Sequence, residues 1–173
     1  MVYTMGKKFI LTAGVFISIF ILLYSLYAWS PPNVLMIEEV KTGEILWQQP
    51  IEKEEWFRHE YVHSVEKSKV IEKFKFSSDG EMLAMESWTR SFGAGMPYEQ
   101  RGTVEFIDGY YVLSDLNDPI EVLHMIPSHL QLHTFHFNEE EIVLSEPPFK
   151  RNHIKIEVVQ LSIIERISYI FSR

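Results

Sequence analysis

Residues 69–90 read KVIEKFKFSSDGEMLAMESWTR, and this stretch decides the fold. In its first half, lysines alternate with mostly apolar residues, which is the period-two pattern of a half-buried β-strand. Because lysine ammonium groups stay in water, the opposite face carries the buried set, which is Val70, Glu72, Phe74 and Phe76. The pattern therefore places the Glu72 carboxylate on the core face.

A turn signal, Asp79-Gly80, joins this strand to the next one. A three-residue loop over residues 78–80 puts Gly80 in the left-handed conformation that such loops prefer. It also predicts the opposed pairs Phe76/Met82, Phe74/Ala84, Glu72/Glu86 and Val70/Trp88. A two-residue Asp-Gly loop is the alternative, and it places Phe74 opposite Met85 and Lys73 opposite Glu86.

Short strand patterns and turn signals continue on both sides of this hairpin, with little helical periodicity. They predict a single all-β domain over residues 34–161, an antiparallel β-sandwich or barrel-like fold. The predicted strands are 34–40, 44–48, 56–64, 69–76, 81–90, 103–107, 110–114, 119–125, 131–137, 141–145 and 153–161. Asp108-Gly109 is a second hairpin signal.

The N-terminal region is different, because residues 9–28 are uncharged and long enough to cross a bilayer as a helix. Lys7 and Lys8 precede this run, so the positive-inside rule predicts a cytoplasmic tip at 1–8 and an extracytoplasmic main domain. We expect a transmembrane anchor at 9–29 and a linker at 30–33. A cleaved signal peptide is the alternative.

Composition excludes several classes of function. Among the 173 residues, 14 basic and all 24 acidic residues follow the predicted anchor, for a net charge of −10 on the outer part. This charge argues against nucleic-acid binding. With no cysteine, the chain has no disulfide, no zinc ribbon and no cysteine nucleophile. No cofactor or metal is implied, and no complete catalytic set is visible.

Residues 162–173 have apolar side chains at helical spacing, which predicts a short C-terminal amphipathic helix. Two roles for it stay open. The helix packs on the sheet, or it lies on the membrane or against a partner helix.

A polar site is expected on the strands beside the hairpin. A four-residue loop over 65–68 places Tyr61 opposite Glu72 and His63 opposite Val70, so that Tyr61, Glu72 and Glu86 form one row. Two carboxylates on an apolar face share a proton, bind a cation or pair with a base. The hypothesis is a cation, amine or proton site that includes His63 and His129. The alternative is a hydrogen-bonded network that only stabilises the fold.

A second candidate is the glycine-rich segment 91–95, which reads SFGAG. Gly93, Ala94 and Gly95 allow the backbone N–H groups to converge on one point, where they can hold a carboxylate. Arg90 lies next to this segment, so an organic acid is the expected ligand. A bulged turn between two strands is the alternative.

Three blocks carry a family resemblance: YVHSVEK at 61–67, SFGAGMP at 91–97 and PSHL at 127–130. Their order and spacing resemble the family named domain of unknown function 1850, over about residues 33–161. The first block adds Glu66 to the candidate binding residues. The resemblance implies a small extracytoplasmic protein associated with a TAXI-type TRAP transporter, which is a sodium-coupled carrier of organic acids with a soluble binding protein.

These observations predict a single-pass protein of the cell membrane, with its N-terminus in the cytoplasm. Its expected function is that of an accessory or regulatory protein, acting through contact with a TRAP transporter permease or its binding protein. The alternative is a small-ligand or cation-binding module that uses the carboxylate pair and the glycine-rich loop.

Overall fold

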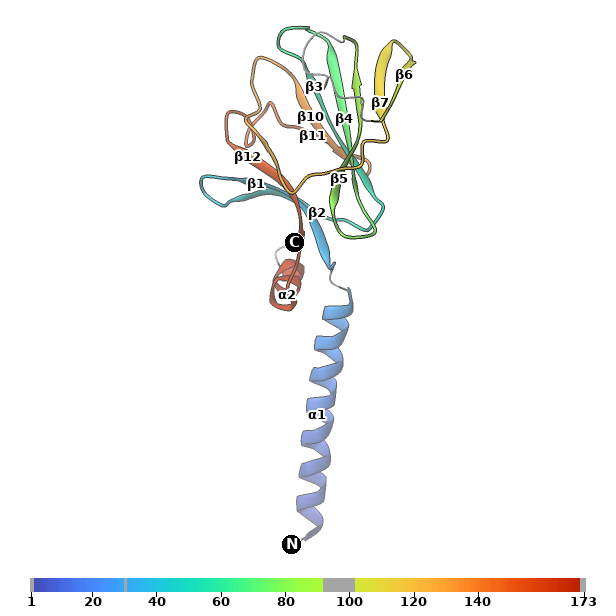
Figure 1. The fold of residues 1–173 in the computed structure, drawn as a ribbon. Helices are drawn as coiled ribbons and strands as arrows, with labels where there is room; N and C mark the ends of the chain where they lie inside the picture. The colour runs from blue at the N-terminus through green and yellow to red at the C-terminus, as the bar shows by residue number, and fades with distance from the viewer. Residues whose placement is uncertain (1, 30, 92–101, 172–173) are drawn as a thin grey trace. The chain divides into compact units, whose positions relative to one another are not determined.

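The strands between residues 33 and 160 form two antiparallel sheets in the computed structural model, which describes residues 2–29, 31–91 and 102–171 (Figure 1). Sheet A has the order β2 (Ile45–Pro50), β1 (Asn33–Glu39), β12 (Ile154–Gln160) and β9 (Leu123–Met125). Sheet B has the order β11 (Glu140–Val143), β10 (His133–Phe137), β3 (Trp56–Val62), β4 (Lys69–Phe76), β5 (Met82–Thr89), β7 (Tyr110–Ser114) and β6 (Thr103–Ile107). The short β8 (Asp118–Pro119) also pairs with β5.

The all-β prediction is confirmed, and the fold is two sheets rather than a closed barrel. Most predicted strands agree with the structure to within one or two residues, and those at 69–76, 103–107 and 110–114 agree at both ends. The predicted strand 119–125 is wrong as a single element. It divides into β8 and β9, which pair with different sheets, because Pro119 lacks an N–H to continue the ladder.

The core lies between the facing sides of the two sheets. Phe57 stacks on Phe74 at 5.3 Å between ring centroids, and Trp47 of sheet A packs edge-on against Phe135 of sheet B at 5.6 Å. Phe135 has no exposed surface. The alternation predicted for β4 is confirmed, because Val70, Phe74 and Phe76 are buried while the lysines of this strand lie on the other face.

The hairpin between β4 and β5 confirms the three-residue loop but only half of the predicted register. Ser77 N donates to Glu81 O, Gly80 has a φ of +87°, and Phe74 lies opposite Ala84. Beyond this pair Met85 is an extra residue, and the bulge places Glu86 opposite Lys73 and Ser87 opposite Glu72. The predicted Glu72/Glu86 and Val70/Trp88 pairs are therefore wrong.

The turn between β3 and β4 is also shifted from the prediction. His63 N donates to Ser68 O and Lys67 has a φ of +51°, so the loop comprises residues 64–67 rather than 65–68. Tyr61 then lies opposite Val70, and His59 lies opposite Glu72. The partner of Tyr61 is thus two residues away from the predicted one. Because side chains alternate between faces with a period of two, Tyr61 keeps its predicted face.

Helix α1 (Val2–Trp29) and helix α2 (Ile163–Phe171) belong to a second compact unit, separate from Asn33–Val159. The longest run of α1 with described side chains is 12–25. In the described part of the chain, no helix is long and apolar enough to cross a membrane. The anchor at 9–29 is therefore not confirmed.

The predicted C-terminal helix is confirmed as α2. It begins with a capping box, because Ser162 N donates to Glu165 Oε2 at 2.8 Å and Glu165 N donates to Ser162 Oγ at 3.4 Å. Arg166 contacts α1 by donating from Nη2 to the Tyr27 carbonyl at 2.9 Å.

Gly102, at the open end of the β6–β7 hairpin, tests this fold. Its φ is +78°, and a Cβ there would lie 2.1 Å from the Ser114 carbonyl oxygen. We expect Gly102→Ala to lower the free energy of unfolding by about 2–4 kcal/mol, because overpacking adds to the left-handed strain. Urea unfolding of the full-length protein measures this loss.

Gly109→Ala is the matched control. Gly109 has a similar φ of +82°, but nothing lies within 4 Å of the added Cβ. This variant should lose only about 1–2 kcal/mol, the strain of the left-handed conformation. Equal losses in the two variants would contradict the predicted clash with Ser114.

Candidate functional site

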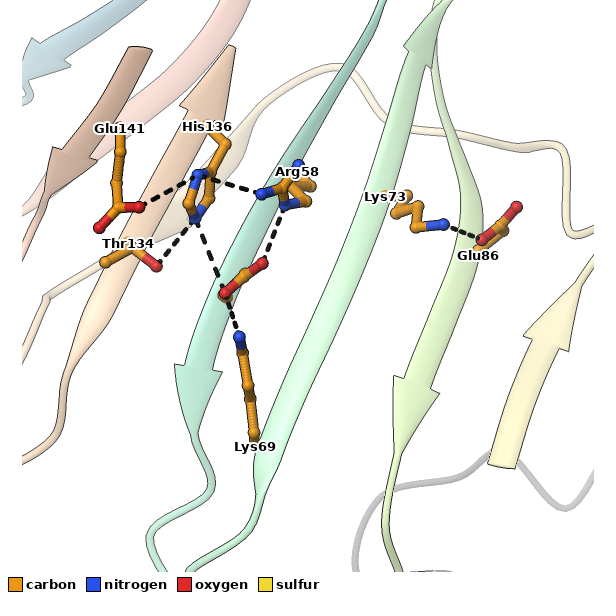
Figure 2. A network of polar contacts seen from close by, with 8 residues as sticks. Arg58, Lys69, Lys73, Glu86, Thr134, His136 and Glu141 are labelled. Atoms are coloured by element: carbon orange, nitrogen blue, oxygen red, sulfur yellow. Dashed lines mark hydrogen bonds and ion pairs between the residues drawn. The ribbon is translucent and has the colours of Figure 1, made fainter. Parts of the chain in front are cut away.

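A row of five ionisable residues crosses the outer face of sheet B. Strand alternation explains the row, because Phe57 and Phe74 fill the core and their neighbours Arg58 and Lys73 must point outward. Each member lies directly opposite the next on the neighbouring strand. In order from β11 to β5, the outer-face row consists of Glu141, His136, Arg58, Lys73 and Glu86 (Figure 2).

At the β5 end of the outer-face row, Lys73 and Glu86 form an ion pair with 2.7 Å between Nζ and Oε2. Trp88 Nε1 donates to the same carboxylate oxygen at 2.7 Å, and the Lys73 ammonium lies 4.4 Å from the Trp88 ring centroid. Burial raises the pKa of Glu86, but hydrogen bonds from Lys73 and Trp88 outweigh burial, and the pKa lies below its ordinary value.

Next to Arg58 in the row, Glu60 forms ion pairs with two cations. Its Oε1 lies 2.8 Å from Arg58 Nε, and its Oε2 lies 2.5 Å from Lys69 Nζ. Burial raises the pKa of Glu60, but the hydrogen bonds from Lys69 and Arg58 lower it by more. The pKa of Glu60 is therefore below its ordinary value. Glu60 therefore stays ionised at neutral pH and orients the Arg58 guanidinium.

His136 is held in its neutral form next to Arg58. Arg58 Nη2 lies 3.3 Å from His136 Nδ1, and Thr134 Oγ1 lies 3.2 Å from His136 Nε2. Because arginine only donates, Nδ1 accepts and Nε2 carries the proton. Burial and the Arg58 charge lower the pKa of His136, despite the more distant carboxylates of Glu60 and Glu141.

The row borders a groove of about 310 Å³ on the same face of sheet B. It is lined by one exposed aromatic residue, by one buried phenylalanine, by three residues of the row and by one turn residue. These lining residues are Trp56, Phe57, Arg58, Lys73, His136 and Asn138. Its charged lining residues, Arg58 and Lys73, are both basic.

A second polar cluster, the inner cluster, lies on the core face of sheet B and consists of His59, Tyr61, Glu72 and His133. His59 is buried, and its Nδ1 lies 3.7 Å from Glu72 Oε2. Its Nε2 lies 3.3 Å from His133 Nδ1, and the three rings stack with centroids 5.1–5.7 Å apart. A carboxylate and two imidazoles in contact can hold and pass a proton.

Two members of the inner cluster, Tyr61 and His133, have shifted pKa values. Burial, together with the charge of Glu72 and a hydrogen bond to it, raises the pKa of Tyr61 to about 12. Burial and the neighbouring His59 lower the pKa of His133. The tyrosine thus remains a hydrogen-bond donor and His133 remains neutral at physiological pH.

The structure brings together only part of the predicted polar site. Tyr61 and Glu72 meet on the core face, and the Tyr61 hydroxyl donates a hydrogen bond to the carboxylate. Glu86 lies on the opposite face, bound to Lys73, so the predicted pair of facing carboxylates is wrong. His63 lies at the end of β3, where its Nδ1 accepts from Glu66 N at 3.2 Å.

The remaining candidates lie elsewhere. Arg90 places its guanidinium 4.8 Å from the Tyr110 ring centroid. His129 contacts Arg151, with 3.2 Å between Nδ1 and the arginine Nε, and joins neither polar cluster. Gly93, Ala94 and Gly95 lie outside the described residues.

Sequence reasoning missed His59 and His133 of the inner cluster. His59 was visible on the same face as Tyr61 by alternation, but only the register placed it opposite Glu72. His133 comes from β10, which is 74 residues away from His59 along the chain, and the sequence carries no signal of this pairing. Within the described residues, no group of three or more His, Asp or Glu side chains can hold a metal ion.

Comparison with known proteins identifies the family of this chain. The family model "Domain of unknown function (DUF1850)" matches residues 57–144, just over half of the chain. The chain belongs to the DUF1850 family. The match runs from β3 to β11 and so includes both polar clusters of this DUF1850 protein. Neither the curated proteins nor the solved structures contain a match.

The inner cluster predicts a linked titration in this DUF1850 protein. Glu72→Gln removes the charge that disfavours tyrosinate, so the pKa of Tyr61 should fall from about 12 toward its ordinary value of 10. It should stay above 10, because the burial remains. A ¹³C NMR titration of the tyrosine Cζ resonances measures this shift. Glu66→Gln, the same change in an exposed turn, should leave Tyr61 unaltered, and an unshifted Tyr61 in Glu72→Gln contradicts the assigned contact.

His133 predicts a dependence of stability on pH. Its pKa in the folded protein lies below the ordinary 6.5, so the unfolded chain binds more protons between these two values. The contribution to stability is complete above about pH 6.5 and is lost as the pH falls through the folded pKa. One proton sets a limit of about 1.4 kcal/mol per pH unit, and the partly exposed ring gives less.

Urea midpoints measured between pH 7 and pH 5 test this dependence. His136 titrates in the same direction, so His133→Gln should reduce the slope without abolishing it. Identical slopes for His133→Gln and the wild type would show that His133 does not contribute.

Proposed function

We propose that this DUF1850 protein is a membrane-anchored extracytoplasmic accessory protein that acts through contact with a TAXI-type TRAP transporter. The observation that carries the anchor is the exposure of apolar side chains along α1. Phe16, Phe20 and Tyr24 are 64–71% exposed on one side, and Ile17, Ile21 and Leu22 are 58–59% exposed on others. A helix that is apolar all round requires an apolar environment, and the uncharged run 9–28 provides the length for a bilayer.

The same unit offers a second contact for the membrane surface. Ile163, Ile164 and Phe171 of α2 are 61–77% exposed, which suits a helix lying in the membrane interface. Arg166 places its guanidinium 4.1 Å from the Tyr27 ring centroid, near the C-terminal end of α1. A tyrosine and an arginine at the end of an apolar helix are typical of the membrane–water boundary.

The outer domain offers an edge strand for contact with a protein. β6 ends sheet B in the described part of the chain, as Figure 1 shows, and all five of its residues are exposed. Val104 and Phe106 are 51% and 66% exposed. Exposed edge strands with apolar side chains recruit partners by strand addition. The transporter as the partner rests on the family resemblance.

Purification of the tagged full-length protein from native membranes tests both parts of the proposal. The protein should remain in membranes washed with alkaline carbonate, and a mild-detergent extract should co-purify a transporter permease or its binding protein. Phe106→Glu should reduce this recovery at least tenfold, because it places a charge on the proposed contact strand.

Val65→Glu is the matched control, since Val65 is 74% exposed in the turn between β3 and β4. This variant should recover the partner at the wild-type level. Release by carbonate would refute the anchor. A clean protein with no transporter subunit would refute the accessory role as a stable complex.

A further inference from the structure

The groove on the outer face of sheet B has the properties of a ligand site. Its volume of about 310 Å³ lies at the lower end of the range for small-molecule pockets. We propose that this groove binds a small organic carboxylate, with the carboxylate between Arg58 and Lys73 and the apolar part against Trp56. This proposal rests on the groove alone and does not require the transporter partner.

The first argument is the cation pair at the centre of the outer-face row. Arg58 and Lys73 lie directly opposite each other on β3 and β4, so their Cβ atoms are about 5 Å apart. Like charges in this position repel, and each of these two cations contacts an acidic partner, Glu60 or Glu86, on its far side. An anion between them gains from both charges.

The second argument is the position of the acidic partners. Arg58 contacts Glu60 through Nε, and Lys73 contacts Glu86 on the neighbouring strand. Figure 2 shows Lys73 reaching toward Glu86 and away from Arg58. The acidic partners thus lie beside the groove rather than in it, and no lining residue is a carboxylate. They orient the two cations and leave the space between them for a ligand.

The third argument is donor capacity. A guanidinium has five N–H donors, and the contacts of Arg58 with Glu60 and His136 involve Nε and Nη2. Donors therefore remain for a forked contact with a carboxylate. Asn138 at the border of the groove carries an amide that can also donate.

The chemical class follows from Trp56. This side chain lines the groove and is 44% exposed, which gives the site a flat apolar wall. An inorganic anion would use the cations but leave the indole in water. A carboxylate attached to a flat apolar group uses both, since burial of the aromatic surface against the indole adds a favourable hydrophobic contribution.

Benzoate is the probe, with benzamide as its uncharged analogue of the same shape. NMR titration of the full-length protein in detergent should show saturable binding of benzoate and at least tenfold weaker binding of benzamide. Arg58→Gln and Lys73→Gln should each weaken benzoate binding at least tenfold. Lys155→Gln removes the same charge from sheet A, where Lys155 pairs with Glu38 and Glu157, and should stay within twofold of the wild type.

Several results would overturn the proposal. These are the absence of saturable benzoate binding to the wild type, equal binding of benzamide, and unchanged affinity in folded Arg58→Gln. Equally tight binding of inorganic phosphate would assign a general anion site instead. If both charge variants fail to fold, Trp56→Leu decides, because this exposed side chain is not needed for the core. It should weaken benzoate binding at least fivefold, and unchanged affinity refutes the site.

Discussion

The charged outer face of sheet B depends on one cross-strand ion pair, between Lys73 on β4 and Glu86 on β5. The bulge at Met85 makes this pair possible, because it moves Glu86 from the core face to the outer face. It occurs where β5 changes partners, from β8 beside Ala84 to β7 beside Ser87. Without the bulge, the carboxylates of Glu72 and Glu86 would lie directly opposite each other on the core face and repel.

As a consequence, the two faces of sheet B carry different chemistry. The core face holds the inner cluster of stacked aromatic rings, with one carboxylate at its border. The outer face holds fixed charges, with Arg58 and Lys73 flanked by Glu60 and Glu86. Burial is the largest cause of the pKa shifts of Tyr61 and His133 on the core face, whereas hydrogen bonds from neighbouring donors outweigh burial at Glu60 and Glu86 on the outer face.

The outer-face row also explains how a strongly acidic domain can present a local basic site. The acidic residues near the groove are used as partners that orient cations, rather than as groups that line the groove. Local geometry therefore outweighs the net charge of the domain at this position. Such a site differs from the predicted glycine-rich anion site, because rigid strands rather than a loop hold its charged groups.

The sequence by itself determined the all-β class, the ends of most strands and the face of each β4 side chain, because alternation and turn residues act locally. It also placed Tyr61 and Glu72 on one face. Only the tertiary structure decided that Glu86 meets Lys73 and that His133 joins His59, because a bulge and a pairing between distant strands leave no local pattern. A one-residue slip in register reverses the face of every following side chain, so function on this sheet depends on what the sequence specifies least.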